Sequence, residues 1–375
     1  MFIPPHCPNP DCEHYDSPAV QGWYHSIGRY STKTFGTVPR FRCRSCRLGF
    51  SKQTFSIDYY AKRRLDYSYI YHKINDGAGL RKIGRDLHAS CDSITNRINR
   101  MARNATLANR QIVNLLPLRE DLVLDGLQNF CNSQFFPDNY TIAVGKDSQF
   151  VYECDYATIR RAGRMTTAQK KRREELEKHF RVNRRSIEES FTRVLRSIAM
   201  KAPKREIPLI LYTDEKSDYR RSMWKDNQIR EKMFSGQWRH HMTNSKVGRN
   251  TRNPLFSVNY MDREIRKDMA SQTRETVQFP RNVANAMLRM NLYLFDHNIF
   301  KPYRIREEAG NLQSHAEVAG LERQVLEGIT GGFFSFRFFK PGELKLSESA
   351  QRTISRDWET PLKVKDEVRR KYLAA

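Results

Sequence analysis

The hydrophobic positions change their spacing several times along the chain, and each change predicts a different kind of element. Between residues 20 and 42, aromatic and polar residues alternate with glycine and proline among them, as in short strands. From Ile70 to Met101 the apolar residues recur at helical spacing, in three stripes separated by "DGAG" and "HAS". This part of the chain is therefore expected to form a small strand region followed by three helices.

The second and third of these helices match the layout of a helix-turn-helix. A tight turn separates them, and Ser90 or Asp92 can cap the third helix. That helix carries polar side chains able to reach base edges in a major groove. The DNA contacts expected from this unit are Arg85, Asn96, Arg97 and Arg100. Residues 55–112 are thus predicted to form a DNA-binding domain, the alternative being a plain helical bundle with a solvated basic face.

Further along the chain, continuous apolar runs replace the helical stripes. "REDLVLDGLQNF" contains an apolar run ending at Asp125, "NYTIAVGKDSQFVYECDYATI" resembles a hairpin, and "EIPLILYTDEKSDY" is an apolar strand ending at Asp214. A buried strand fixes a carboxylate at the open edge of a sheet, so the two aspartates are candidate ligands of one or two Mg²⁺ or Mn²⁺ ions. Such a site cleaves and transfers phosphodiesters. Each aspartate taken alone is equally typical of a turn.

The segment between these strands, residues 157–206, is helix-forming and rich in arginine and lysine. One interpretation is a charged helix solvated on most of its surface. The other is a basic helical insertion that lies along a DNA backbone. The sequence does not choose between them.

Composition narrows the class of partner. The chain has 375 residues, and 66 Lys and Arg against 42 Asp and Glu give a formal net charge of +24. An excess of this size favours a polyanionic partner, and the length favours several domains. No apolar run approaches the roughly 20 residues that a membrane span needs, and the N-terminus lacks the pattern of a secretory signal. We therefore expect a cytoplasmic, nucleoid-associated protein with no membrane partner.

Cysteine spacing predicts a metal site in residues 1–54. "CPNPDC" and "FRCRSC" each place two cysteines across a turn, and the four are Cys7, Cys12, Cys43 and Cys46. Tetrahedral zinc takes four thiolates from two such turns, and a fragment this small has little apolar surface with which to fold alone. The prediction is a structural zinc ribbon, with two unrelated turns as the alternative. Nearby arginines suggest that the ribbon rests on phosphates.

Five segments together resemble the compact zinc-ribbon transposases of bacterial insertion sequences, members of the DDE superfamily. The segments are "CPNPDC…CRSC", "LRKIGRDLHAS", "LVLDG", "YTDEKSDY" and "NPLFSVNYMDREIRKDMASQTRETVQFPRN". The resemblance covers most of residues 1–305. It implies an RNase H-like sheet in residues 113–305 with strand-borne Asp125 and Asp214, and a third acid on a later helix. It also implies metal-dependent cleavage of double-stranded element ends and strand transfer into target DNA, and we expect a homo-oligomer on that DNA.

The chain departs from this family at the third acid, where it holds Asn259. Asp262 comes three residues later and would share a helix face with Asn259. We expect Asp262 to supply the missing charge and Asn259 to act as a neutral ligand or hydrogen-bonding group. The alternative is an ion-paired surface helix, because basic residues lie among the acids here. Basic residues expected to contact DNA near this site are His241, Lys246, Arg249 and Arg266.

Residues 306–375 form a C-terminal extension to which no function is assigned. Its aromatic and basic run, "FFSFRFFKPGE", either stacks on bases or packs against the catalytic domain. The complete hypothesis is a multidomain α/β protein: a zinc ribbon, a helix-turn-helix, and an RNase H-like mixed-sheet domain with a basic helical insertion. Its function is that of a DNA transposase. The alternatives are a domesticated, non-catalytic DNA-binding regulator and a nuclease that does not transfer strands.

Overall fold

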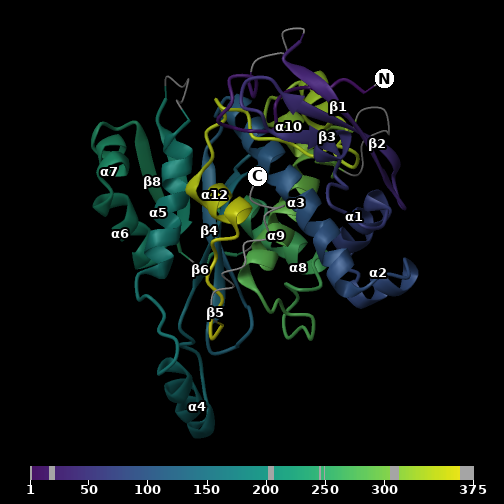
Figure 1. The fold of residues 1–375 in the computed structure, drawn as a ribbon. Helices are drawn as coiled ribbons and strands as arrows, with labels where there is room; N and C mark the ends of the chain where they lie inside the picture. The colour runs from purple at the N-terminus through teal and green to yellow at the C-terminus, as the bar shows by residue number, and fades with distance from the viewer. Residues whose placement is uncertain are drawn as a thin grey trace.

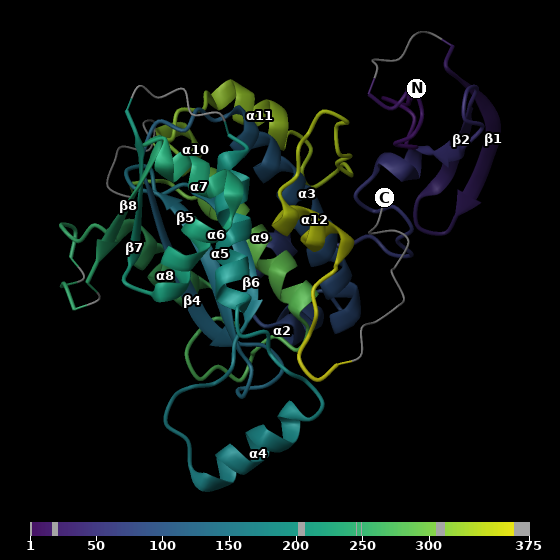
Figure 2. The same ribbon diagram turned by 90° about the vertical axis from the view of Figure 1, so that its left-hand side faces the viewer.

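The computed structural model describes residues 2–16, 22–201, 207–244, 246–248, 250–304 and 312–363. Figure 1 shows a large sheet flanked by helices, with a small sheet from the N-terminal region at one end. Figure 2, turned by 90°, shows the small sheet standing beside the larger body. The predicted mixed α/β class is therefore confirmed.

The large sheet has five strands in the order β6-β5-β4-β7-β8. Its first three strands form an antiparallel meander, and β7 and β8 then add parallel to β4. The strands are β4 (Leu122–Phe130), β5 (Pro137–Gly145), β6 (Val151–Thr158), β7 (Leu209–Asp214) and β8 (Trp238–Thr243). The apolar runs of the sequence become β4, β5 and β7. Strand β5 buries nearly all of its side chains because the sheet is covered on both faces, whereas the side chains of β7 alternate between buried and half-buried.

Helices cover the two faces of this sheet. On one face lie α5 (Ser186–Ala199), α6 (Ser217–Lys225) and α7 (Asn227–Phe234), packed with Leu122 and Leu124 of β4. On the other lie α8 (Phe256–Asp268) and α9 (Val283–Ile299), packed with Val123 and Leu127. Towards the C-terminus follow α10 (His315–Val318), α11 (Arg323–Thr330) and α12 (Glu348–Ser355). None of the described helices is both long and apolar enough to cross a membrane.

Three helices precede the sheet: α1 (Tyr67–Asn75), α2 (Leu80–Asp86) and α3 (Cys91–Leu115). Ser90 caps α3 by accepting a hydrogen bond from the Ser93 amide, as the sequence predicts. The turn between α2 and α3 is tight: a Cβ added at Gly84 would lie 2.7 Å from the Ala89 carbonyl oxygen. The third helix is much longer than a recognition helix needs, and its second half packs along α9 in the interior.

The basic segment 157–206 contains two helices in different environments. Helix α4 (Thr167–Glu177) stands apart from the rest of the molecule in both views (Figures 1 and 2), and most of its side chains are exposed. Helix α5 packs on β5 and β6 and buries Phe191, Val194 and Leu195 completely. Of the two helices, α4 alone has the exposure expected of a basic insertion.

The N-terminal sheet consists of β1 (Tyr24–Thr32), β2 (Gly36–Cys43) and β3 (Gly49–Ser51), followed by the 3-10 helix η1 (Lys52–Phe55). The C-terminal aromatic and basic run closes onto this unit. The Arg337 amide donates to the Phe55 carbonyl at 2.9 Å, and the Tyr15 hydroxyl donates to the Lys340 carbonyl at 2.6 Å. Of the two interpretations of this run, packing is the one the structure shows.

Candidate active site and metal centre

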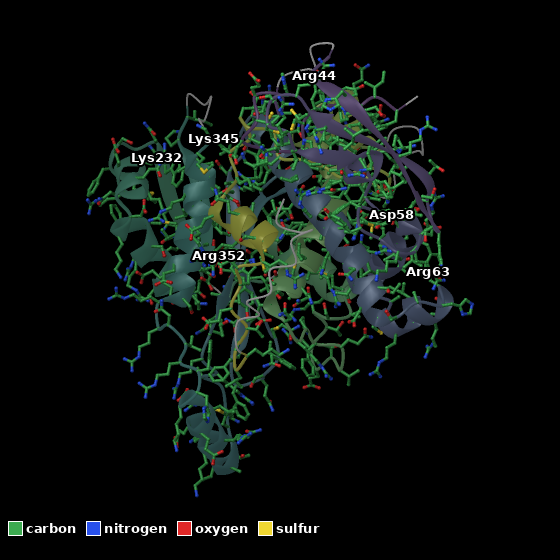
Figure 3. All side chains as sticks on the ribbon, viewed as in Figure 1. Arg44, Asp58, Arg63, Lys232, Lys345 and Arg352 are labelled. Atoms are coloured by element: carbon green, nitrogen blue, oxygen red, sulfur yellow. The ribbon has the colours of Figure 1, made fainter. Side chains whose placement is uncertain are left out.

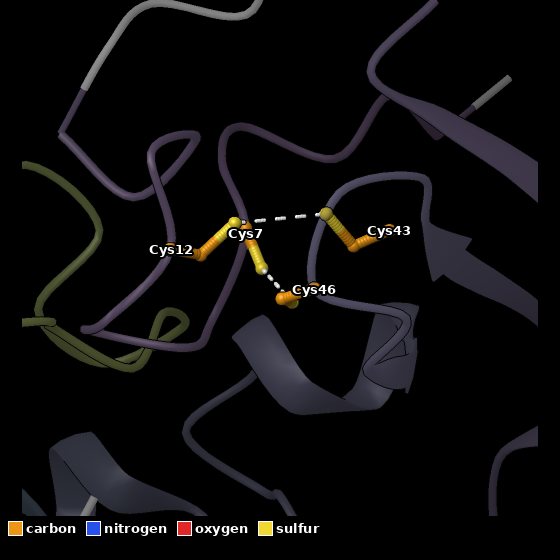
Figure 4. Close-up of side chains that lie close together, drawn as sticks. All are labelled: Cys7, Cys12, Cys43 and Cys46. Carbon is orange, nitrogen blue, oxygen red and sulfur yellow. Dashed lines mark hydrogen bonds between the residues drawn. The ribbon is translucent and has the colours of Figure 1, made fainter.

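The four N-terminal cysteines converge from two turns, as Figure 4 shows. Their Sγ atoms all lie within 4.8 Å of one another, with Cys7 and Cys46 3.5 Å apart and Cys12 and Cys43 3.7 Å apart. A tetrahedral zinc ion with Zn–S bonds of about 2.3 Å requires Sγ separations of about 3.8 Å. The cluster therefore has the dimensions of a zinc site, and Cys7, Cys12, Cys43 and Cys46 could hold the ion.

The chemistry of the cluster also fits a cation. Burial raises the pKa of the Cys7 thiol and of the Cys43 thiol, because thiolate charge is costly in this small core. A bound Zn²⁺ offsets that cost, so binding is expected to release protons and to stabilise the ribbon. The surrounding core is aromatic, with Trp23 stacked on Phe50 at a centroid distance of 5.6 Å.

Asp125 and Asp214 lie on adjacent strands of the large sheet. In the parallel pair of β4 and β7, Val123 is opposite Tyr212, and each aspartate comes two residues later. The two aspartates therefore occupy the same level of the sheet. They also share a face, because Val123 and Tyr212 both pack into the core beneath α8 and side chains two residues apart point the same way.

The protein environment distinguishes the two carboxylates. Burial raises the pKa of Asp125 above its usual range, and the nearby charge of Asp214 raises it further. The Tyr219 hydroxyl of α6 donates to Asp125 Oδ1 at 3.3 Å, and the Lys216 amide donates to Asp214 Oδ1 at 3.0 Å. The two carboxylates are thus near enough to act on each other's charge, and a cation between them would relieve the repulsion. Among the described residues, however, only the four cysteines form a group of three or more His, Cys, Asp or Glu ligands at metal-binding distance, so Asp125, Asp214 and Asp262 are not assembled as a closed metal site in this structure.

Helix α8 crosses this face of the sheet from one end of β4 toward the other. Near its start, the Ser257 hydroxyl donates to the Lys146 carbonyl at 2.6 Å, and the Lys146 amide donates to Asp121, next to the start of β4. Near its end, Arg266 donates to the Gln128 carbonyl of β4 at 2.9 Å. The middle of α8 therefore lies above Asp125.

One flank of α8 is joined to α9 by ion pairs and hydrogen bonds. Asp268 accepts from Lys301 at 2.8 Å and from the Tyr293 hydroxyl at 3.0 Å. Glu264 accepts from Lys267 at 2.7 Å and pairs with Lys301. These bonds lower the pKa of Glu264 although burial opposes the change. Glu264 and Asp268 thus have the ion-pairing role that the alternative interpretation gives this helix.

The opposite flank of α8 carries Asn259, Asp262 and Arg266, at successive turns. Because Glu264 and Asp268 face α9, these three residues lie on the side of α8 away from α9. Arg266 reaches β4 from this flank, and Asp262, one turn earlier, lies between the two anchor points of the helix. Asn259 and Asp262 are both half-buried. The flank that could complete a site with Asp125 therefore offers one carboxylate, from Asp262, and one amide, from Asn259.

A groove of about 990 Å³ adjoins the sheet between the ends of β4 and β5 and the α4 segment. It reaches from Gln128 and Lys216, beside the aspartates, to the base of α4. Its basic lining residues are Arg160, Arg161, Lys178, Arg181, Arg184 and Lys216. In Figure 3 many nitrogen-tipped side chains project from α4 and the chain leading to it. The lining also includes Glu174, Glu177 and Asp218, so the groove carries a net positive charge, and neither Asp125 nor Asp214 lines it.

The prediction that Arg97 and Arg100 read a DNA groove is wrong for this conformation. Both side chains are buried, with 6% and 4% of their surfaces exposed. Arg97 donates to the Arg63 carbonyl at 2.6 Å, and Arg100 donates to the carbonyls of Ile57 and Tyr59 at 2.7 and 2.5 Å. Segments 57–63 and 333–338 cover this part of α3, so its polar side chains bind protein carbonyls instead of bases.

The other predicted DNA contacts have mixed environments. Arg85 on α2 is exposed, Asn96 on α3 is half-buried, and Lys246 is exposed in the loop after β8. His241 is exposed beside Tyr212, with ring centroids 5.1 Å apart. Arg266 is bound to backbone carbonyls, as described above, and Arg249 lies outside the described residues. Of these six, Arg85, His241 and Lys246 have the exposure that a DNA contact requires.

Three residues near the carboxylates are not singled out by the sequence pattern. Lys216 and Tyr219 follow Asp214 within five residues, and both act on Asp125: the charge of Lys216 lowers its pKa and the Tyr219 hydroxyl binds it. The sequence feature that could have identified Lys216 and Tyr219 is their position shortly after Asp214, the acid at the end of a strand. Lys146 is the other such residue; its ammonium donates to the Tyr212 hydroxyl at 3.0 Å on the same face of the sheet.

No protein-family model matches the sequence, and no curated protein matches it. Among solved structures, one match is to the "CryoEM structure of simian T-cell lymphotropic virus intasome in complex with PP2A regulatory subunit B56 gamma". The sequence identity is 13%, the TM-score is 0.28, and the match spans 56% of this chain and 56% of the chain in that structure. A likeness at this level carries no inference, so the function is argued from the site alone.

Proposed function

We propose that this protein is a DDE-type DNA transposase whose large sheet is an RNase H-like catalytic domain. One observation carries the proposal: Asp125 and Asp214 stand level on adjacent parallel strands and on one face, with α8 crossing above them. The strand order, a meander followed by two parallel strands, supports the same type of domain. The reaction is cleavage of phosphodiesters at the element's ends and their transfer to target DNA.

In this proposal Asp125, Asp214 and Asp262 hold the divalent ions. When bound, Mg²⁺ or Mn²⁺ activates a water or a 3′-hydroxyl and stabilises the leaving oxygen. Tyr219 fixes the orientation of Asp125, and the backbone amide of Lys216 fixes that of Asp214. Arg266 holds α8 against β4, so that Asp262 and Asn259 keep their place above the sheet.

The charge distribution supports DNA as the substrate. The net charge is +24, and the groove at the base of α4 is lined by more cationic than acidic residues. Phosphate neutralisation by such a surface gives binding that weakens steeply with salt. Arg85, His241 and Lys246 are proposed as further phosphate or base contacts, and the Cys7, Cys12, Cys43 and Cys46 ribbon as a second DNA-binding module.

A non-catalytic DNA-binding regulator is the second candidate, and Asn259 favours it. An amide at the position of an acidic ligand contributes no charge to hold a second cation. Under this alternative the protein binds the same DNA and leaves it intact with either metal ion.

The test is cleavage of duplexes that carry the terminal repeats flanking the gene, with Mg²⁺ or Mn²⁺. Asp125→Asn and Asp214→Asn are each expected to lower the cleavage rate at least about a thousandfold, because the metal site is worth several kcal/mol. DNA affinity should stay near wild type. Asp147→Asn, on the exposed β5–β6 turn, is the matched control and should cleave normally. Specific binding by the wild-type protein without cleavage would support the regulator instead.

Asp262→Asn and Asn259→Ala separate the roles on α8. If Asp262 supplies the charge, its amide variant should lose cleavage while its melting temperature stays unchanged. Asn259→Ala should then reduce cleavage less, since a neutral ligand contributes less to holding the ions. Full activity of Asp262→Asn would exclude Asp262 from the site.

A further inference from the structure

A second groove, of about 810 Å³, lies where the three N-terminal helices meet the catalytic domain. Its walls are the turn between α1 and α2, the start of α3, the loop 269–282 and the first half of α9. The two sides approach closely: a Cβ added at Gly79 would lie 2.9 Å from the side-chain oxygen of Gln278, and one added at Gly77 would lie 3.1 Å from the Asp268 carbonyl oxygen.

The lining of this groove is basic. Four of its residues are cationic, namely Arg81, Lys82, Arg281 and Arg289, and none is acidic. Two of the cations belong to α2 and two belong to α9 or the residues just before it. The N-terminus of α9, capped by Asn282, also opens here and adds its partial positive charge. Two separate parts of the chain therefore direct positive charge into one space.

Arg289 is the unexplained member of this set. Burial lowers the pKa of its guanidinium, and its Nε is enclosed without a hydrogen-bond partner. Within the described part of the chain no carboxylate or carbonyl accepts from its other nitrogens either. The group whose charge acts on it is the thiol of Cys131, and burial raises the pKa of that thiol so that it stays protonated. The residue as a whole is half-buried and its terminal nitrogens are not among the enclosed atoms, so they reach the groove and are bound there by no acceptor of the described residues.

The buried arginines of α3 show what is missing. Arg97, Arg100 and Arg110 are more deeply buried than Arg289 and likewise have an Nε without a hydrogen bond, but each donates through a guanidinium Nη to a carbonyl or a carboxylate. Arg110, for example, pairs with Glu153 at 3.0 Å. The protein therefore supplies acceptors where an arginine is structural. At Arg289 the open side is the groove.

We propose that this groove binds a backbone phosphate of the DNA, with the half-buried Arg289 as its anchor and Arg281, Arg81 and Lys82 at its rim. The identity of the ligand as DNA rests on the proposed function. A phosphate fits because it carries charge and several acceptors for a planar guanidinium. Loop 269–282 also touches the end of β4, with Phe279 and Phe130 rings 4.9 Å apart. DNA bound in the groove is thereby connected, through loop 269–282, to β4, which bears Asp125.

The experiment compares Arg289→Met with Lys232→Met in the full-length zinc-bound protein. Both variants lose one positive charge, and Lys232 lies on α7, on the opposite side of the molecule from α2 (Figure 3). Arg289→Met should weaken binding to end DNA about ten- to a hundredfold at low salt, as expected for charge-assisted hydrogen bonds. Its melting temperature without DNA should be equal to or above that of wild type, because the described residues give this guanidinium no acceptor whose hydrogen bond would be lost.

Three results would overturn the proposal. Arg289→Met could melt lower with DNA affinity unchanged, which is a structural role. It could lose no more affinity than Lys232→Met, which is a non-specific charge effect. Finally, inorganic phosphate could raise the melting temperature of wild type but not of Arg289→Met, while both proteins bind DNA equally well. That result would show that the groove binds a free anion and not DNA.

The proposed function and this site fail separately. If DNA binding depends on Arg289 but the wild-type protein cleaves no DNA, the transposase function is excluded and the phosphate site is supported. If Arg289→Met binds and cleaves DNA normally, the phosphate site is excluded and the transposase function is supported.

Discussion

The ribbon and the large sheet both gather acidic or thiol ligands, but they depend on a metal in different ways. In the ribbon, Cys7, Cys12 and Cys43 are themselves core residues, beside a few aromatic rings. In the sheet, the core is made by apolar strands and the helices on both faces, while Asp125 lies within the central strand β4 and Asp214 ends β7. A small core without metal is marginal, whereas a large apolar core is stable alone.

The comparison shows that a metal ligand can be part of the fold or an addition to it. Removing zinc from the ribbon removes the cross-link between its two turns. Under the proposed function, removal of a divalent ion from Asp125 and Asp214 would leave the strands that carry them packed, and only the repulsion between the carboxylates would grow. The two regions meet along α3, where its buried arginines bind carbonyls of segments 57–63 and 333–338.

The largest effect should come from zinc removal. A chelator or Cys43→Ser is expected to unfold the ribbon, because structural zinc contributes about 10–16 kcal/mol in small zinc-binding domains. Amide NMR signals from β1 and β2 should collapse while those from β4 and β5 remain. Cys91→Ser, at a half-buried lone cysteine, is the control and should keep one zinc per chain. Simultaneous loss of both regions would show that the sheet depends on the ribbon, contrary to the comparison.

A smaller effect should come from breaking the junction at Arg100. Arg100→Met removes the guanidinium donor of the Tyr59 carbonyl, leaves the Ile57 carbonyl with the Tyr67 hydroxyl as its donor, and removes a guanidinium 4.3 Å from the centre of the Tyr59 ring. We expect a loss of about 3 kcal/mol in the free energy of unfolding, measured with urea. Arg85→Met, at an exposed position of α2, should change stability by less than about 0.5 kcal/mol and lower DNA affinity. Unchanged stability with lost DNA binding for Arg100→Met would restore its predicted contact with bases.

Acid should destabilise the sheet region selectively and by the smallest amount. Burial lowers the pKa of His315 to about 4, and its ring stacks on His297 beneath the β5–β6 turn, hydrogen-bonded to the Ser148 carbonyl at 2.8 Å. The unfolded chain therefore binds more protons between pH 6.5 and 4, so stability is lost as pH falls through that window. His315 alone should account for about 2 kcal/mol between pH 7 and pH 5.

The measurement is urea unfolding at pH 7 and pH 5 for wild type, His315→Gln and the exposed control His179→Gln. The pH dependence should shrink only for His315→Gln. Asp138 acts with the opposite sign, because burial raises its pKa to about 7 and its protonated form stabilises the fold at low pH. Asp138→Asn should therefore steepen the acid loss. An acid transition confined to the ribbon would contradict this assignment.

Local sequence determined much of this molecule. The cysteine turns, the Ser90 cap and the apolar runs of β4, β5 and β7 all follow from short-range chemistry, and each appears where the spacing predicts it. The ends of those runs also place Asp125 and Asp214 on strands. These features are local because capping, turn formation and side-chain alternation depend on residues a few positions apart.

Only the tertiary structure decided which charged residues are exposed. Arg97 and Arg100 have the spacing of DNA-reading residues, but segments returning from residues 57 and 333 cover them and supply their acceptors. The two flanks of α8 look alike in sequence. Because α9 and Lys301 lie along one flank, Glu264 and Asp268 form ion pairs and hydrogen bonds there, whereas Asp262 lies on the opposite flank. Arg289 differs from the other buried arginines for the same reason. Burial and pairing are set by distant segments, which no spacing along the chain records.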